Sequence, residues 1–409
     1  MTLKKRNKSR EPLDRVAKLY LAYKFFGALY FSYPIFYEFA SQTITPIQVG
    51  LFFSTIGICG FLAEIPTGII ADKKSRKFSG LFGMTMLVVA PLVIYFGHTF
   101  SAYLAAALFY GLGRAFLNGA LDSLVYDHKN ITKETYRRVN AHEITFGQAG
   151  ILVGAACGGL LFSASHSAPF IADAVTGIIC LILILFMQEN HKDGYAKVAT
   201  SHTQHFTQSM KLLVATPYLK VIVTMGVIFS VMLGMCIQFV NEAAMIELGF
   251  QASTRGFLIS GAGVVTLIIL NLFLLNVLKT DTARIVYMGC GAIAAYTLMS
   301  IGLIPLFLCG YLMWCCLNAT SSFLRVILQD HIPSTHRSTI LSSFKSLAIL
   351  IGLGASTSTG LLVQWAHTPR AAYLLFAVTA VAILLPCTFW LVRQLKATSY
   401  SVLPVSKTD

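Results

Sequence analysis

Charged residues are scarce in this chain. Asp, Glu, Lys and Arg make up 12% of its 409 residues, and 56% of the residues are hydrophobic. Soluble domains carry about 25% charged residues. The apolar residues recur in runs of roughly 20, the length that a helix needs to cross ~30 Å of hydrocarbon. The composition therefore argues against an ordinary soluble protein and predicts a membrane protein with several spans.

Catalytic and metal-binding patterns are also missing. The sequence has no Ser/His/Asp order, no phosphate-binding Walker loop and no H-E-x-x-H, so we predict neither an enzyme nor direct use of ATP. The nine cysteines fall mostly inside apolar runs, without the spacing of a zinc site or a disulfide framework. We expect no metal and no cofactor.

The net charge of +14 is spread in a way that fits a membrane rather than a nucleic acid. Most Lys and Arg residues lie in the amino-terminal tail and in alternate loops between apolar runs. Positive charge gathers on the cytoplasmic side of membrane proteins, so we expect both termini in the cytoplasm. We predict a multi-pass membrane protein that contacts the lipid bilayer and does not bind nucleic acid.

The apolar runs predict an all-α membrane protein with twelve transmembrane helices. The predicted spans are 17–41, 46–71, 78–97, 101–126, 139–164, 167–188, 217–241, 252–277, 283–303, 304–330, 338–364 and 369–393. The most polar connection separates the first six from the last six. We therefore predict a six-helix bundle over 1–188 with a basic tail, a cytoplasmic loop over 189–216 and a second bundle over 217–409 with a cytoplasmic tail. Paired bundles with a substrate path between them are a recurrent transporter plan, and we expect a monomer.

The loop between the second and third spans combines Gly68, Asp72, Lys73, Arg76 and Lys77. Gly68 would permit close helix packing. Asp72 would cap a helix or pair with an Arg, and the last two cations would anchor the turn at anionic headgroups. The plain alternative is a basic cytoplasmic loop, which needs neither the glycine nor the carboxylate.

This loop resembles the G-x-x-x-D-[RK]-x-G-[RK]-[RK] signature of the major facilitator superfamily, with Ser75 in place of the second glycine. The preceding Glu64-Ile-Pro-Thr-Gly68 resembles the E-x-P-T-G of a bacterial drug-efflux-like branch. The resemblance implies the major facilitator fold, transport by alternating access, and a loop that latches the two halves in one state.

Small residues line the fifth span. Gly150, Gly154, Gly158 and Gly159 resemble an antiporter signature, G-x-x-x-G-P-x-x-G-G, with Ala155 where the proline is expected. The glycines would let neighbouring helices approach closely. The alternative is a generic packing face of small residues, which would look similar. The antiporter-like glycines favour export, whereas Ala155 leaves import open.

Four ionisable residues fall inside the early spans: Lys24, Glu64, Arg114 and Asp122. Such residues usually face a cavity or a partner. We expect Lys24, Glu64 and Asp122 around one vestibule, with Glu64 or Asp122 carrying a proton and Arg114 tuning it. The alternative is a static ion pair that only fixes helix packing.

Aromatic residues are the remaining candidates for solute contact. We expect Tyr30, Tyr33 and Trp314, together with Lys24, to line a substrate cavity, against the alternative that they pack in the core. Asp173 and Glu242 are interpreted as interfacial.

The favoured function is proton-coupled export of small hydrophobic or cationic molecules, including drugs, across a bacterial inner (plasma) membrane, as the resemblance implies. The alternative is a symporter or facilitator that imports a nutrient or metabolite. A non-transporting receptor is a third hypothesis, which the Asp72 latch disfavours.

Overall fold

The computed structural model describes residues 13–190, 216–321, 323–324, 327–328 and 337–400. These residues form α-helices, one 3₁₀ turn and three π-helical turns, with no β-strand among them. The described chain divides into two compact units. The first contains the residues up to Ile35 and those from Cys59 to 190, and the second contains Phe36–Ile58 and the residues from 216 onward.

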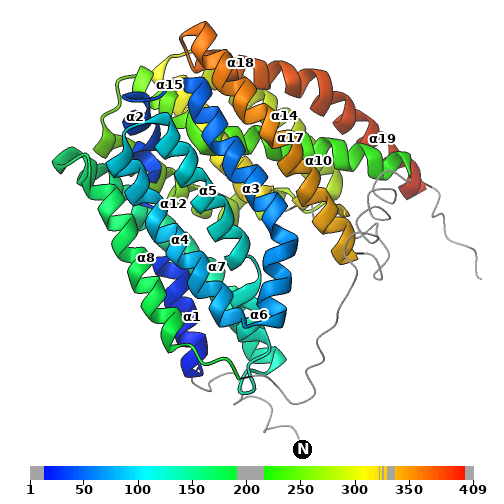
Figure 1. Cartoon of the computed structure of the whole chain (residues 1–409). Coiled ribbons are helices and arrows are strands. Elements are labelled where there is room, and N and C mark those ends of the chain that lie inside the picture. Colours follow the sequence, from blue (N-terminus) through cyan, green and yellow to red (C-terminus); the bar gives the residue numbers. More distant parts are fainter. Residues whose placement is uncertain (1–12, 191–215, 322, 325–326, 329–336, 401–409) are drawn as a thin grey trace, which may run out of the picture. The chain divides into compact units, whose positions relative to one another are not determined.

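The first unit is built on long helices that follow one another in the chain. It contains α1 (Arg15–Phe26), η2 (Tyr33–Ile35), the second part of α3 (Pro46–Lys73), α4 (Arg76–Gly97), α5 (Phe100–Leu117), α6 (Ala120–Tyr126), α7 (Lys133–Ala164) and α8 (Ala168–Phe186). Helix α4 packs between α5 and α8, and α1 packs against α7 and α8 (Figure 1).

The second unit combines an early segment with the later helices. It contains α2 (Phe36–Ser41), the first part of α3, α10 (Pro217–Met235), α11 (Asn241–Glu247), α12 (Ala252–Ile269), α13 (Leu275–Val277), α14 (Asp281–Ser300), α15 (Ile304–Thr320), α17 (Arg337–Ala366), α18 (Arg370–Thr379) and α19 (Leu385–Tyr400). The π-helical turns η3 (Cys236–Val240), η4 (Leu270–Leu274) and η5 (Ala380–Leu384) join α10 to α11, α12 to α13 and α18 to α19. Helix α14 packs against α15 and α18, and α10 packs against α17.

Nine helices in the described part of the chain are long and apolar enough to cross a bilayer, and they correspond to nine of the twelve predicted spans. Helix α15 is apolar but shorter. Helix α14 occupies the predicted span 283–303, but it is rich in Gly, Ala and Thr and is not among the nine.

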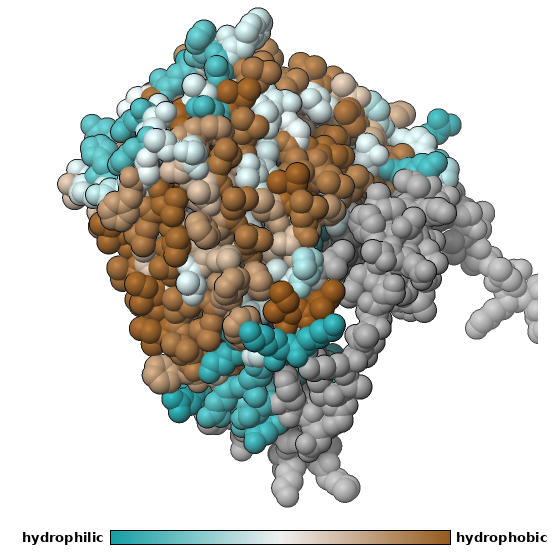
Figure 2. Space-filling view, viewed as in Figure 1, coloured by the Kyte–Doolittle hydropathy of each residue, from teal (hydrophilic) through white to brown (hydrophobic). Residues whose placement is uncertain are grey.

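Apolar side chains also cover the outside of the first unit. Figure 2 shows them over α4 and α8, with hydrophilic side chains beyond the helix ends. On α8 the exposed apolar residues include Ile171, Val175, Ile178, Ile182 and Leu185. Large apolar patches of this kind are rare on soluble monomers, so this surface suits contact with lipid tails.

The prediction of one continuous span over 17–41 is wrong. Helix α1 ends at Phe26, and the next α-helix begins only at Phe36. Pro34 disfavours the α-helical conformation at Tyr33, which lies in the 3₁₀ turn η2, and has no N–H of its own. The carboxylate of Asp173, on α8, accepts the backbone N–H of Phe31 at 2.7 Å and that of Ser32 at 3.3 Å. Asp173 therefore satisfies two N–H groups of the interrupted backbone.

The glycines of α7 face this interrupted segment. A Cβ added at Gly150 would lie 2.4 Å from the carbonyl oxygen of Phe25, and one added at Gly158 would lie 2.0 Å from that of Phe31. A Cβ at Gly154 would lie 2.8 Å from the backbone nitrogen of Tyr30. Gly159 is buried as well. The glycines permit close packing, but much of their partner is unwound chain and not the neighbouring helix that we expected.

We predict that Gly158→Ala lowers the melting temperature of the protein in detergent micelles by several degrees. The added methyl group would overlap backbone atoms, and overpacking of this kind typically costs about 1–3 kcal/mol. Gly147→Ala on the same helix is the matched control, because no atom lies within 4 Å of a Cβ built there. Equal melting temperatures for the two variants would contradict this account.

Candidate functional site

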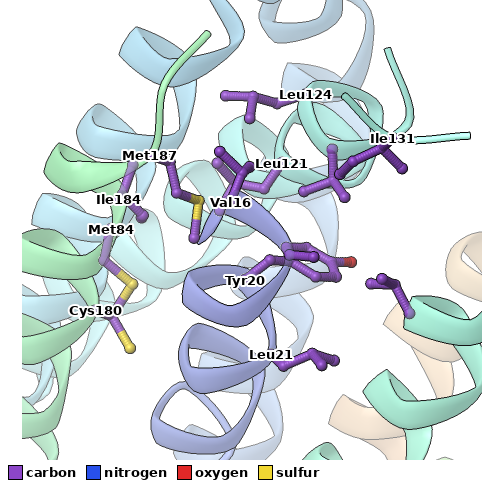
Figure 3. Close-up of a cluster of buried hydrophobic side chains, with 13 residues drawn as sticks. Val16, Tyr20, Leu21, Met84, Leu121, Leu124, Ile131, Cys180, Ile184 and Met187 are labelled. Carbon is purple, nitrogen blue, oxygen red and sulfur yellow. The ribbon is translucent and has the colours of Figure 1, made fainter. Parts of the chain in front are cut away.

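Helix α1 carries Tyr20 and Lys24 on one face, because residues four apart in a helix lie one above the other. Tyr20 is fully buried, and its ring belongs to an apolar cluster contributed by α1, α4, α6, α7 and α8. Figure 3 shows its hydroxyl pointing away from the sulfur atoms of Met84 and Cys180. The apolar cluster therefore fixes the ring and leaves the hydroxyl at its edge.

Two carboxylates meet at that edge. The ammonium nitrogen of Lys24 lies 3.0 Å from Asp122 Oδ1 and 2.7 Å from Glu143 Oε1. The Tyr20 hydroxyl lies 2.9 Å from Glu143 Oε2 and also donates to Asp122 Oδ1. Helices α1, α6 and α7 thus place Tyr20, Lys24, Asp122 and Glu143 in one cluster, called here the coupling cluster.

The coupling cluster holds one more negative than positive charge when its Lys, Asp and Glu are ionised. Its three charged side chains remain partly accessible, at 24% for Lys24, 43% for Asp122 and 23% for Glu143. Charges at partly accessible positions can exchange partners with water or a solute. The arrangement is therefore suited to binding one proton or one other cation.

A cavity of about 330 Å³ adjoins the cluster. Lys24, Glu143, Tyr23, Tyr30 and Gln148 contribute to its lining, as does the segment that starts at Gly27. This volume lies at the lower end of the range of small-molecule sites, about 300–1,000 Å³. The cavity offers a solute an ammonium, a carboxylate, an amide and two phenol rings.

The structure brings together only some of the predicted site residues. Lys24 and Asp122 are in contact, whereas Glu64 accepts a hydrogen bond from the Asn118 amide at 2.9 Å. Arg114 is exposed on α5 and forms no ion pair with a described residue. The structure therefore does not add Glu64 or Arg114 to the coupling cluster.

The aromatic candidates also separate. Tyr30 lines the cavity, whereas Tyr33 lies in η2 and is not part of that lining. Trp314 is buried in α15, with its ring stacked on Tyr311 at 5.7 Å between centroids. Trp314 thus has the core-packing role that was the alternative expectation.

Sequence reasoning missed Tyr20 and Glu143. Glu143 looked like the start of a span, but α7 begins at Lys133, where the Thr132 hydroxyl caps the helix by accepting the Thr135 N–H at 3.1 Å. A threonine followed by Glu134 is an ordinary helix-start signal. That signal would have placed Glu143 about 15 Å along the helix.

The loop between α3 and α4 differs from expectation at two residues. Arg76 is buried, and its guanidinium bonds to the Ser123 carbonyl at 2.8 Å and to Asp127, so it does not anchor at headgroups. A Cβ at Gly68 would meet no described atom within 4 Å, so none of the described residues requires a glycine there. Lys73 ends α3, and the side chain of Asp72 lies outside the described residues.

Ser75 replaces the expected glycine with a helix cap. Its hydroxyl accepts the Phe78 N–H at 3.0 Å and donates to the Glu189 carboxylate. Glu189 also accepts the backbone N–H of Arg76 at 2.8 Å and that of Lys77 at 3.3 Å. The Lys77 ammonium donates to the Leu185 carbonyl at 2.6 Å. The start of α4 is therefore fixed to the end of α8 by contacts that need a hydroxyl at position 75.

Solved structures similar to this one are transporters. A substituted form of the nucleoside transporter NupG has a TM-score of 0.76 and 15% identity, and the match covers 91% of this chain and 98% of that one. A D-xylose–proton symporter has a TM-score of 0.67 and 14% identity, with 91% and 95% covered. A bacterial homologue of the human lysosomal transporter Spinster has a TM-score of 0.67 and 13% identity, with 93% and 96% covered. At these identities the likeness shows the fold alone.

No curated protein matches the chain. The family model described as Major Facilitator Superfamily matches residues 19–355, which is most of the sequence. The all-helical architecture, the apolar helices and the similar folds agree with this match. The chain belongs to the Major Facilitator Superfamily and is a multi-pass membrane transporter rather than an enzyme.

Proposed function

We propose that this transporter exchanges protons for small hydrophobic or cationic molecules, which it exports. The observation that carries the proposal is the coupling cluster, where one ammonium is shared by two carboxylates beside a cavity of small-molecule size. The sequence alone predicts Glu64 or Asp122 as the proton carrier, with Arg114 tuning that carboxylate. The contacts favour Asp122 and Glu143 as proton carriers, with Lys24 and Tyr20 as their partners.

Competition for the surplus negative charge would couple the two movements. A proton on Asp122 or Glu143 neutralises the cluster, and a cationic solute in the cavity would neutralise it in the same way. Because either the proton or the cationic solute is enough to neutralise the cluster, binding of one would favour release of the other. This exchange is the behaviour expected of an antiporter, and the aromatic rings add attraction for cations.

Import by proton symport is the second candidate. The similarity to a D-xylose–proton symporter favours it, because a proton symporter moves its solute together with protons. In this case the protonated cluster would release Lys24 to bind a polar or anionic group of the solute. The two candidates differ in the direction of proton movement relative to the solute.

We also propose the setting of the transporter: a bacterial inner membrane, with both termini in the cytoplasm and a monomer as the working unit. The excess of Lys and Arg in the tail and alternate loops supports this orientation.

The direction can be measured with purified protein in liposomes that contain a pH-sensitive dye. Lipophilic cations, dyes, sugars, amino acids and organic acids are added one at a time under an imposed pH gradient. We expect a lipophilic cation to drive protons opposite to its own movement. Proton movement in the same direction as the solute would establish symport and overturn the export proposal.

We predict that Glu143→Gln reduces accumulation driven by a pH gradient by at least about tenfold while exchange of labelled for unlabelled solute continues. The amide cannot take up a proton, but it preserves the shape of the cavity wall. Glu134→Gln, in the exposed first turn of the same helix, is the matched control and should transport normally. Full pH-driven accumulation by Glu143→Gln would remove this residue from the proton path.

The loop after α3 is proposed to act as a conformational latch. We predict that Asp72→Asn slows transport by about tenfold or more, while the protein remains folded in the membrane, because the amide loses the charge that would pair with a cation or helix terminus. Asp281→Asn, which changes an ion pair within one turn of α14, is the control. Wild-type transport by Asp72→Asn would reject the latch.

A further inference from the structure

The buried carboxylate of Glu242 lies outside the coupling cluster. Glu242 lies in α11 of the second unit, and its side chain accepts two backbone N–H groups from the short helix α2. Oε2 lies 2.7 Å from the nitrogen of Tyr37, and Oε1 lies 2.9 Å from the nitrogen of Glu38. Glu242 is 7% exposed, so water competes little for these bonds. We call this contact the α2 clasp.

An arginine completes the clasp from a third helix. Arg255, on α12, is 1% exposed and pairs with the side chain of Glu38. The same guanidinium donates to the Phe250 carbonyl at 2.8 Å. Helix α2 is thus held by α11 through its backbone and by α12 through its side chain.

The charges around Glu242 do not balance among the described residues. Glu38 and the phenol of Tyr37 interact electrostatically with it from α2, and Arg255 does so from α12. On the α18 side, the Tyr373 hydroxyl bonds to the neighbouring Asn241, and Arg370 pairs with Glu247 at 2.8 Å. Two carboxylates therefore share one guanidinium, and the direct ion pair goes to Glu38. This leaves a net negative charge in a buried region.

We propose that the α2 clasp is a pH-sensitive switch in which Glu242 binds a proton and releases α2. The proton adds to a carboxylate oxygen of Glu242, and the summed charge of Glu242, Glu38 and Arg255 changes from −1 to zero. No other covalent bond forms or breaks. A neutral carboxyl group is a weaker acceptor than a carboxylate, and its protonated oxygen becomes a donor. The two bonds to the N–H groups of Tyr37 and Glu38 weaken together.

The segment that the clasp holds gives the switch its importance. Residues 36–58 precede most of the first unit in the chain, yet they pack on the later helices. The Ser54 hydroxyl donates to the Leu353 carbonyl at 2.6 Å and lies 2.9 Å from the Thr357 hydroxyl. A Cβ at Gly50 would lie 2.4 Å from the Ser356 carbonyl oxygen. Release of α2 would free one end of this packed segment. Proton binding at Glu242 would then alter the packing of residues 36–58, separately from proton binding at the coupling cluster.

Hydrogen–deuterium exchange of the intact protein in lipid nanodiscs tests the switch without a transport assay. The observable is the exchange of peptides covering 36–45, corrected for the intrinsic effect of pH on exchange. Between about pH 8 and pH 5, we expect protection in the wild type to fall by at least about tenfold, because bonds to a charged acceptor are lost. Unchanged protection in the wild type over this range would overturn the proposal, and this arm needs no variant.

Two glutamate variants on α11 sharpen the result. Glu242→Gln removes the titrating group, so the peptides covering 36–45 in this variant should exchange rapidly at both pH values. Glu247→Gln alters a carboxylate that bonds to Thr368 and Arg370, so its peptides should behave as in the wild type. If Glu242→Gln retained the pH dependence of the wild type, another group would be responsible and the proposal would fail. The result is independent of the coupling cluster, because proton antiport can fail while the α2 clasp still titrates.

Discussion

The interrupted backbone of the first predicted span imposes the main constraint on this structure. Between Phe26 and Phe36 the chain leaves helical α-geometry, and hydrocarbon offers no partner for the N–H groups that this exposes. Asp173 accepts two of them in the first unit, and Glu242 accepts two N–H groups at the start of α2, where the helix resumes in the second unit. The glycines of α7 allow close approach to the unwound part. Changes at any of these positions would therefore act on the same stretch of chain.

Both charged clusters combine two carboxylates with one cation, but their contacts differ. Lys24 pairs with both carboxylates of the coupling cluster, whereas in the α2 clasp Arg255 pairs with Glu38 and Glu242 bonds to backbone N–H groups. The coupling cluster is partly accessible beside a cavity, which suits exchange with a solute. The clasp is more deeply buried and bonds to backbone, which suits a change in the position of a helix. Accessibility, more than composition, separates a binding role from a conformational one.

The sequence predicted much of the fold because a span is a local property. Apolar runs located nine helices of membrane length, and the loop around Asp72 indicated the family. The break near Pro34 escaped notice because the surrounding aromatic run is apolar enough to resemble one helix. Its stabilising partner, Asp173, lies more than a hundred residues further along the chain.

The candidate site was harder to predict, since its members come from α1, α6 and α7. Lys24 and Asp122 stood out as charges within apolar runs, but their common partner Glu143 was assigned to a helix end. Tyr20 carried no signal at all, because a tyrosine in an apolar span is ordinary.

The unwound segment after α1 also forms part of the cavity wall, where Gly27 and Ala28 present little besides main chain. Main-chain atoms keep the same chemistry whatever side chain evolution selects. If solute binds in this cavity, as proposed above, variation at Tyr23, Tyr30 or Gln148 would alter the range of solutes, while the peptide groups beside them would supply a constant polar surface. Under that proposal, a few substitutions would change the cargo without rebuilding the site.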